Sequence, residues 1–257
     1  MPPCFGHCRV WAAAGTIHTF PPHSWYDSVP LSLNSKPAFI PATGVHWLLP
    51  LYDPLVAFCT RESSSKQRLL EQIQLESNQR IIDFGCGSGT LLAAMANRAK
   101  NQGLEGFRLT GVDADQRILQ QAGAKLSKNA ARSAAQIELL CHHGPGLPLE
   151  SSIFDACTCS LVFHHLTREQ KRDTLLELRR ILRPGSPFFL MDYGRATNTF
   201  AAMCFLIVRT FDGWKQTADN SAGNLPALLE DAGFEDVREL FRLQTPLGTL
   251  YTWQATA

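Results

Sequence analysis

Short apolar segments alternate with longer amphipathic segments along most of the chain. The apolar runs, of which Arg80–Phe84 is a clear case, have the length of buried strands, and the segments between them repeat apolar residues at helical spacing. The pattern predicts strands over 80–84, 107–112, 137–141, 154–163 and 187–192, and helices over 64–75, 90–101, 114–129, 168–182, 199–211 and 225–232. Residues 237–243 and 250–255 instead alternate apolar and polar positions on either side of a Thr-Pro-Leu-Gly link, which indicates an antiparallel pair.

This order of elements predicts an α/β fold. Short apolar strands that alternate with helices form a parallel sheet covered on both faces. We therefore expect a Rossmann-like, doubly wound, mostly parallel seven-stranded sheet with an antiparallel edge hairpin and helices on both faces. Gly233 is expected at the C′ position that ends the helix over 225–232.

The N-terminal part of the chain has a different pattern. Residues 1–42 are rich in Pro, Ser and His and follow neither period, so we expect an irregular N-terminal extension. Residues 43–257 are expected to form one domain. Its first segment, Val45–Arg61, is apolar and aromatic but interrupted by Pro50 and Pro54, which predicts a broken helix that serves as an N-terminal helical cap.

Composition and charge exclude several classes of protein. A net charge of +1 without a basic stripe argues against a nucleic-acid partner. The eight cysteines are scattered without a Cys-x-x-Cys pair, so we expect no disulfide scaffold and no metal site, but a reducing, cytoplasmic setting. The most apolar stretch, Phe200–Val208, is far shorter than the ~20 residues that a membrane span needs. A buried helix is expected there, with peripheral membrane contact as the alternative.

Three glycines follow the first strand of the alternating pattern, in the stretch RIIDFGCGSGTLL. Gly85, Gly87 and Gly89 lie between a strand and a helix, where missing side chains let a ligand approach the backbone closely. The spacing is Gly-x-Gly-x-Gly, whereas a dinucleotide site has Gly-x-Gly-x-x-Gly. Asp83, just before the turn, repels a pyrophosphate but suits an ammonium group. These features favour a ligand with an amino-acid moiety and disfavour a nicotinamide oxidoreductase.

A second acidic residue ends the next predicted strand. Asp113 stands at the position from which a carboxylate binds both hydroxyls of a ribose in doubly wound folds. Asp115 follows closely and is expected to cap the helix after it.

Four segments together are similar to the class I S-adenosylmethionine-dependent methyltransferases: IIDFGCGSGT, the strand-end acid of TGVDAD, LPLESSIFDACTCSLVFHHL and LRRILRPGSPFFLMD. The resemblance extends from Ile81 to about Phe241. Within the class it is closest to the ubiquinone/menaquinone C-methyltransferases and their small-molecule relatives. The segments HWLLPLYDPL and LPALLEDAGFEDV also resemble that group.

The resemblance implies a binding site for S-adenosylmethionine. Asp83 and the loop of Gly85, Gly87 and Gly89 would hold the ammonium and carboxylate of the methionyl end. Asp113, followed by Ala114, would hold the ribose hydroxyls.

The resemblance also implies contacts farther along the chain. His143 and Gly144 stand where the family often has Asp-Ala, so His143 would stack on the adenine or form a hydrogen bond with it. Ser160, at the end of the fourth predicted strand, matches a position that faces the cofactor.

Methyl transfer from a sulfonium is an in-line displacement, so most of its rate can come from positioning the reactants. A general base adds about 10²–10⁴-fold where the acceptor carries a proton. His164 and His165 follow the fourth predicted strand and are the candidate catalytic bases, His164 first. The alternative is that they pack or cap the next helix. Asp192 and Tyr193 end the next strand and either line the acceptor pocket or have a structural role.

Aromatic and apolar residues outside the strands provide the material for an acceptor lid. Trp47, Tyr52, Phe58, Trp214 and the Phe200–Val208 helix form either that lid or the packing of the cap on the core. An apolar cap favours a small, hydrophobic or aromatic acceptor. The predicted function is S-adenosylmethionine-dependent methylation of such a molecule, and the alternative is a non-catalytic S-adenosylmethionine-binding regulatory or partner protein. The atom methylated and the oligomeric state cannot be inferred from these patterns.

Overall fold

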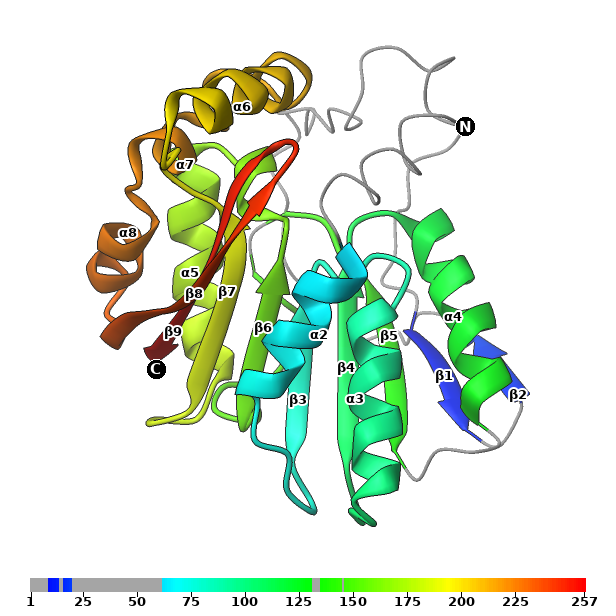
Figure 1. Ribbon diagram of the computed structural model, residues 1–257. Helices are drawn as coiled ribbons and strands as arrows, with labels where there is room; N and C mark the ends of the chain where they lie inside the picture. The colour runs from blue at the N-terminus through cyan, green and yellow to red at the C-terminus, as the bar shows by residue number, and fades with distance from the viewer. Residues whose placement is uncertain (1–8, 14–15, 20–61, 131–134, 145) are drawn as a thin grey trace, which may run out of the picture.

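A single sheet runs through the structure, a computed structural model that describes residues 9–13, 16–19, 62–130, 135–144 and 146–257. The strand order is β2-β1-β5-β4-β3-β6-β7-β9-β8 (Figure 1). Its parallel part consists of β3 (Arg80–Phe84), β4 (Arg108–Asp113), β5 (Gln136–Cys141), β6 (Ala156–Ser160) and β7 (Pro187–Tyr193). At one edge β9 (Gly248–Thr256) and β8 (Glu235–Thr245) pair antiparallel.

The winding of the sheet reverses beside β3. The chain proceeds from β3 outward through β4 to β5, then returns to the other side of β3 and continues through β6 to β7. The predicted doubly wound, mostly parallel sheet with an antiparallel edge pair is therefore confirmed. The gap between the carboxyl ends of β3 and β6 is the place where such sheets bind ligands.

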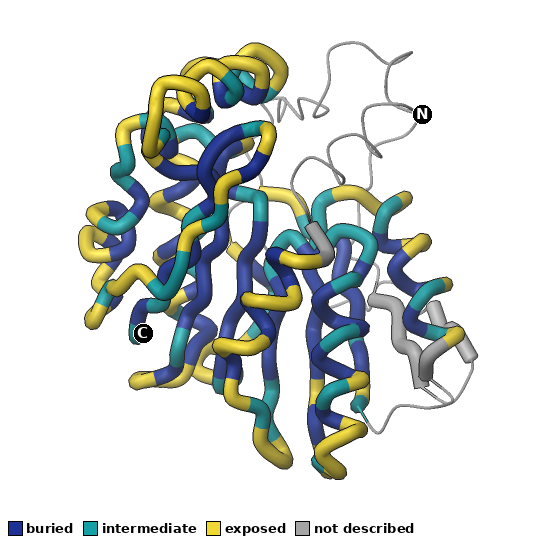
Figure 2. Tube along the Cα trace, viewed as in Figure 1, coloured by how far each residue is buried: buried dark blue, intermediate teal, exposed yellow. Residues whose placement is uncertain are grey.

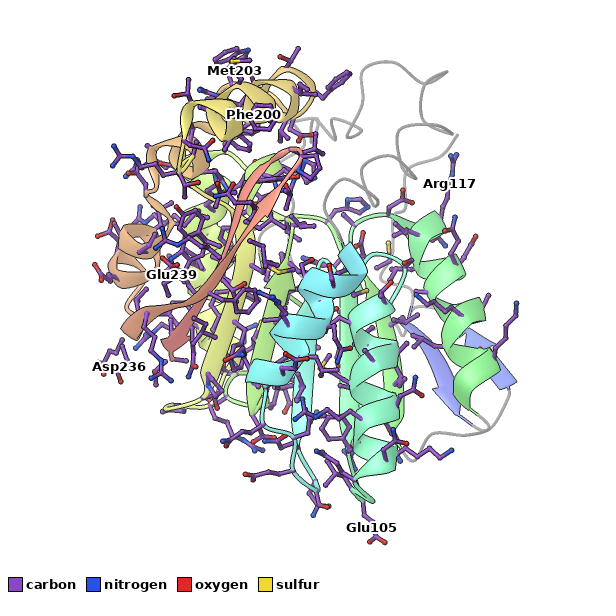
Figure 3. All side chains as sticks on the ribbon, viewed as in Figure 1. Glu105, Arg117, Phe200, Met203, Asp236 and Glu239 are labelled. Carbon is purple, nitrogen blue, oxygen red and sulfur yellow. The ribbon has the colours of Figure 1, made fainter. Side chains whose placement is uncertain are left out.

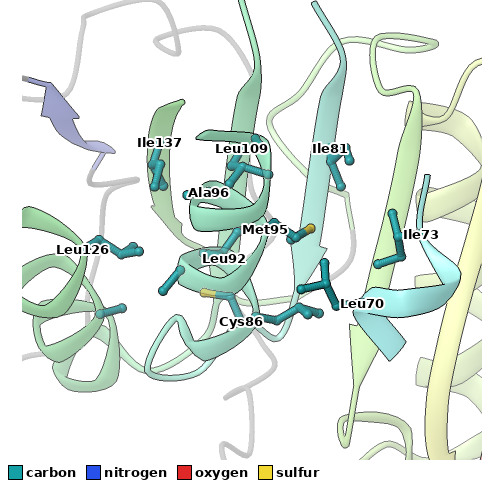
Figure 4. Packing of buried hydrophobic residues seen from close by; sticks show 14 of the residues in the cluster. Leu70, Ile73, Ile81, Cys86, Leu92, Met95, Ala96, Leu109, Leu126 and Ile137 are labelled. Carbon is teal, nitrogen blue, oxygen red and sulfur yellow. The ribbon is translucent and has the colours of Figure 1, made fainter. Parts of the chain in front are cut away.

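Helices cover both faces because successive strand residues point to opposite sides. Ile81 belongs to the core under α2 (Glu62–Gln72), α3 (Thr90–Asn101) and α4 (Gln116–Ala130). Ile82 belongs to the core under α5 (Arg168–Ile181) and α8 (Leu225–Asp231). Figure 4 shows the first of these cores, and Figure 2 shows that the central strands are buried throughout most of their length.

Two further helices follow β7. The helix α6 (Thr199–Asp212) lies beyond the carboxyl ends of the parallel strands in Figure 1, and α7 (Ala218–Ala222) follows it. Gly233 lies directly after the C-cap of α8 with φ +85°, as predicted. Of the described helices, none is long and apolar enough to cross a membrane.

The N-terminal region differs from its prediction as an irregular extension. Within residues 1–42 the structure has β1 (Arg9–Ala13) and β2 (Thr16–Thr19), which form an antiparallel hairpin. The strand β1 pairs with β5, where Val10 lies opposite Leu139, so the sheet has nine strands instead of seven. Such short strands show no clear period in the sequence, and the unpaired edge of β5 provides the partner that the sequence does not reveal. The predicted cap over Val45–Arg61 and the expected boundary at residue 43 lie outside the described residues.

Candidate cofactor and acceptor site

The three glycines of the turn after β3 all have left-handed backbone conformations. Their φ angles are +72° for Gly85, +53° for Gly87 and +71° for Gly89, a region that side chains disfavour. A Cβ on Gly85 would lie 2.1 Å from Cγ2 of Val162, and a Cβ on Gly89 would lie 3.2 Å from Cβ of Ala122. The turn thus packs directly against the segment after β6 at Gly85 and closely against α4 at Gly89, whereas at Gly87 the nearest side-chain atom, Cδ1 of Ile118, is 3.9 Å from the Cβ position.

The turn delivers the chain into the N-terminus of α3. Gly89 is the N-cap of this helix and has no side chain to accept hydrogen bonds from the first N–H groups. Those groups and the helix dipole favour an anion such as a carboxylate. The end of the turn therefore suits the carboxylate of an amino-acid ligand.

Asp83 places a buried carboxylate at the start of the same turn. Its side chain accepts a hydrogen bond of 2.7 Å from Oγ1 of Thr158 on β6. Burial raises the pKa of Asp83 from 3.8 to about 6, while the charge of Lys66 and the Thr158 hydrogen bond oppose the rise and Asp113 adds to it. A carboxylate in this state is stabilised by an arriving cation. The sequence-based expectation of an ammonium partner agrees with this electrostatic setting.

Lys66 is a charged residue near the turn that sequence reasoning missed. It lies in α2, is only 8% exposed, and its charge acts on both Asp83 and Cys86. Leu70, four residues later, packs in the same core as Cys86 (Figure 4). The sequence did contain a signal for Lys66, because a lysine stands there on the apolar face of an amphipathic helix, where a hydrophobic residue is expected.

Asp113 joins the end of β4 to the glycine turn. Its Oδ2 accepts a hydrogen bond of 2.8 Å from the Gly87 N–H, and its Oδ1 accepts one of 3.0 Å from the Asp115 N–H. A carboxylate has further lone pairs, so both oxygens retain acceptor capacity. The Asp115 side chain in turn accepts a hydrogen bond of 2.8 Å from the Arg117 N–H at the start of α4, which confirms its predicted capping role.

The remaining predicted cofactor residues lie at the carboxyl ends of neighbouring strands. Ala114 directly follows Asp113, and His143 and Gly144 follow β5, where His143 is exposed and Gly144 has φ +91°. Ser160 is buried at the end of β6, two residues before the Val162 that contacts Gly85. The structure thus brings all the predicted cofactor residues to one edge of the sheet.

The two candidate catalytic histidines form part of an ionic cluster, in which His164 is buried and His165 is exposed. They lie in a short 3₁₀ helix, Phe163–His165, directly after β6. His164 Nδ1 is 2.8 Å from Oδ1 of Asp192, and Oδ2 of Asp192 accepts a hydrogen bond of 2.7 Å from the Phe163 N–H. Burial lowers the pKa of His164, but Asp192 and then Asp212 raise it by more, so the net shift is upward.

Asp192 connects this cluster through hydrogen bonds to several surrounding residues. Burial raises its pKa, but the charge of His164 and the hydrogen bonds from His164 and the Tyr193 N–H lower it by more. Asn220 Nδ2 also approaches its Oδ1 at 3.2 Å. Tyr193 is buried against Phe205 of α6. Of the two predicted roles for Asp192 and Tyr193, these contacts favour the structural one.

The helix α6 has one buried and one exposed apolar face. Its buried face, which includes Phe205 and Val208, packs against Tyr193 and Leu250. Phe200 and Met203 project outward, as Figure 3 shows, and are 69% and 60% exposed. Trp214 is exposed and lies beneath the guanidinium of Arg209, while the predicted lid residues Trp47, Tyr52 and Phe58 lie outside the described residues.

Comparison with known proteins shows a similarity to methyltransferases. Residues 81–185 match a family of methyltransferase domains. An uncharacterised methyltransferase of Synechocystis is 26% identical over 69% of this chain and 77% of its own length. A 2-phytyl-1,4-naphtoquinone methyltransferase of Trichormus variabilis is 26% identical over 65% of this chain and 67% of its own length. Two other relatives are longer proteins, of which the aligned part spans 32% and 37%.

Solved structures show the same fold. Magnesium protoporphyrin IX methyltransferase of Synechocystis, with bound S-adenosylhomocysteine, aligns with a TM-score of 0.56 at 18% identity, over 78% of this chain and 84% of that one. The fold of the chain is therefore that of solved S-adenosylmethionine-dependent methyltransferases, and residues 81–185 are similar to the methyltransferase-domain family.

Proposed function

We propose that the protein uses S-adenosylmethionine to methylate a small, hydrophobic or aromatic molecule. The observation that carries the cofactor part of this proposal is the turn between Asp83 and α3, in which three glycines have positive φ, a buried carboxylate precedes the turn and a helix N-terminus without a side-chain cap follows it. When bound, S-adenosylmethionine supplies the methyl group. The residues around the turn fit its charges, because the methionyl end carries both an ammonium and a carboxylate.

Asp83 would bind the methionyl ammonium, and the N–H groups at the start of α3 would bind the carboxylate. Lys66, whose charge acts on Asp83, would add positive charge near the methionyl end. Asp113, with Ala114, would hold the ribose hydroxyls through the acceptor capacity that Gly87 and Asp115 leave free.

The adenine would lie beyond the end of β5. His143 is exposed there and could stack on the ring, while Gly144 leaves the backbone open because no atom lies within 4 Å of the position of a Cβ. Ser160 would face the cofactor from the end of β6. Each of these assignments follows from the family resemblance and from the strand ends that the residues occupy.

A small apolar acceptor is supported by charge, by the surroundings of α6 and by the relatives. The net charge of +1 is low for a nucleic-acid-binding protein. The exposed apolar residues of α6 lie beyond the carboxyl ends of the strands, on the side where the cofactor residues gather (Figure 1). Relatives are named for methylation of a naphthoquinone and of a magnesium porphyrin, both of which are large, mostly apolar ring systems.

Positioning in a site protected from water would supply most of the rate, with proton removal where the acceptor requires it. His164 and His165 are the proposed bases. In the structure both ring nitrogens of His164 face carboxylates, whereas the His165 side chain is 40% exposed. His165 therefore has the better access to an acceptor, and His164 would act through its contacts with Asp192 and Asp212.

The proposed setting is the cytoplasm, and the proposed unit is one methyltransferase domain over residues 43–257 that includes a helical cap at Val45–Arg61, with the hairpin of β1 and β2 added to its sheet. The five described cysteines are all free thiols, which agrees with a reducing compartment.

Calorimetry followed by an acceptor screen tests the function. The full chain is titrated with S-adenosylmethionine and, as the control, with NADH, and we expect heat only with the former. Mass spectrometry then detects a methyl gain on a panel of quinols, phenols, thiols and amines, with transfer RNA as the contrasting acceptor. Methylation of the RNA and of no small molecule would overturn the proposed acceptor class while leaving the enzyme class intact.

A further inference from the structure

Three metal-ligating side chains from two distant parts of the chain meet in the ionic cluster. His164 and His165 follow β6, and Asp212 ends α6. One ligand atom of each lies within 4.8 Å of the others. His164 Nε2 is 3.8 Å from Oδ2 of Asp212, and His165 Nδ1 is 3.3 Å from its Oδ1.

Asp212 is a buried carboxylate without an adequate partner. Its side chain is 4% exposed, and its Oδ1 accepts no hydrogen bond from any part of the chain that the structure describes. The His165 ring is close enough for ionic attraction, but its orientation does not produce a hydrogen bond. A buried carboxylate oxygen requires a donor or a cation, so the position points to a positively charged ligand.

His164 is held in the orientation of a metal ligand. Its Nδ1 is hydrogen-bonded to Asp192, and its Nε2 is directed toward Asp212. A metal-ligating histidine almost always donates its other ring N–H to a carboxylate or carbonyl in this way. Asp192 is itself fixed by the N–H groups of Phe163 and Tyr193, so the imidazole ring has a fixed direction.

We propose that His164, His165 and Asp212 bind a divalent transition-metal ion of the zinc type, through Nε2, Nδ1 and a carboxylate oxygen. Tetrahedral zinc with bonds of about 2.0–2.2 Å requires ligand atoms about 3.3–3.6 Å apart. His165 Nδ1 is 3.3 Å from Oδ1 of Asp212 and His164 Nε2 is 3.8 Å from its Oδ2, so each nitrogen lies close to that separation from one of the two carboxylate oxygens. Two imidazoles and one carboxylate select zinc-like ions over magnesium or calcium, which prefer oxygen ligands.

The site has an open coordination position. The His165 side chain is 40% exposed, so a metal ion beside it is accessible to water or to an acceptor heteroatom. With three protein ligands this is the arrangement of catalytic rather than structural zinc sites. An ion would occupy the nitrogens that the proposed base needs, so the metal-loaded protein would not use them to remove a proton.

The competing explanation is a cluster of protonated histidines paired with acids. The charged groups that act on His164 are Asp192 and Asp212, whose negative charge attracts both a proton and a metal ion, and Lys171, whose positive charge repels both. Both explanations require the same contacts. They differ in whether the protein takes up a metal ion.

Zinc uptake by the full chain without S-adenosylmethionine decides between them, independently of any methyl transfer. The protein is treated with a chelator, dialysed against zinc and analysed for bound metal. We expect the wild type to hold one zinc more than Asp212→Asn and His165→Ala. Asp231→Asn, which changes an exposed acid on α8, is the matched control and should bind as the wild type does.

Two further readouts separate the site from cysteine ligation and from misfolding. Cobalt(II) bound here should show the visible bands of a low-symmetry site without a thiolate charge-transfer band, and Asp212→Asn should lose those bands. Zinc should raise the unfolding midpoint of the wild type and of Asp231→Asn but not of Asp212→Asn. Equal zinc content in the wild type and Asp212→Asn, or no zinc in the wild type, would overturn the proposal.

Discussion

Replacing Gly85 with alanine tests the packing of the glycine turn. Alanine at φ +72° is strained by about 1–2 kcal/mol. The new Cβ would also lie 2.1 Å from Cγ2 of Val162, a short, stiff side chain that cannot rotate away freely. Overpacking of this kind costs about 1–3 kcal/mol. The free energy of unfolding should therefore fall by about 2–5 kcal/mol in total.

Gly103→Ala is the matched control for this change. Gly103 has φ +67°, but nothing lies within 4 Å of its Cβ position. Only the backbone strain applies there, about 1–2 kcal/mol. Both substitutions reduce the conformational entropy of the unfolded chain by the same amount. The difference between the two variants in free energy of unfolding therefore isolates the contact with Val162.

Urea denaturation of Gly85→Ala, Gly103→Ala, Val162→Ala and the double variant Gly85→Ala/Val162→Ala provides the measurement. Because Val162→Ala removes the clashing methyl group, the glycine substitution should cost less in that background than in the wild type. Calorimetry should show weaker S-adenosylmethionine binding by Gly85→Ala, since the turn must move. Equal costs for Gly85→Ala and Gly103→Ala, with no relief in the double variant, would refute the close approach as the reason for this glycine.

Three other predictions concern the charged residues of the site. Asp83→Asn should stabilise the cofactor-free protein near neutral pH by roughly 3 kcal/mol, the equivalent of the rise from 3.8 to about 6, while weakening S-adenosylmethionine binding. The folded protein keeps the Asp83 proton to a higher pH than the unfolded chain does, so the free energy of unfolding of the wild type falls as pH rises from about 4 to about 6. Denaturation curves at both ends of that range should show that the difference in stability between Asp83→Asn and the wild type grows with pH. Asp113→Ala should weaken cofactor binding strongly, both by removing the proposed ribose acceptor and by releasing the Gly87 N–H; unchanged affinity by calorimetry would mean that the ribose lies elsewhere. His165→Gln should lower turnover more for a phenol or amine acceptor than for an ionised thiolate, and equal losses on both would contradict a role in proton removal.

The elements around the glycine turn could be predicted closely because their signals are local. The strand Arg80–Phe84 and the helix Thr90–Asn101 have their predicted bounds. The first is a short apolar run and the second repeats apolar residues at helical spacing, and glycines with positive φ separate the two elements. Parallel strands end at one edge of a sheet, so residues after successive strands had to lie near one another. This explains why Asp83 and Asp113 could be grouped from the sequence.

The end of β6 could not be predicted in this way. Residues 154–163 form one apolar run, and the sequence indicated a single strand, but β6 ends at Ser160. Leu161 takes a left-handed conformation at φ +59°, and its N–H bonds to Met191 of β7. A local pattern cannot indicate such a turn, since it depends on a partner about 30 residues later in the chain.

Buried charges were missed for a related reason. Asp212 follows an apolar helix and has the sequence appearance of an exposed helix end, yet it lies against His164 and His165. Lys66 could have been noticed on its apolar face, but its electrostatic partner Asp83 lies beyond the end of its helix. In both cases the partners of the charged residue are brought to it by tertiary contacts, which a local sequence pattern does not show.

The segment Ser160–His165 connects these features. The left-handed turn at Leu161 directs Val162 toward Gly85, and the next residues direct the Phe163 N–H and the His164 ring to Asp192. One short segment therefore fixes both the glycine turn that we propose to bind the methionyl end and the histidines that face Asp212. Strain of about 1–3 kcal/mol at a non-glycine residue persists only where the surroundings over-determine it. Here the Met191 hydrogen bond, the contact with Gly85 and the ion pair with Asp192 do so, which ties the geometry of the cofactor turn to that of the histidine cluster.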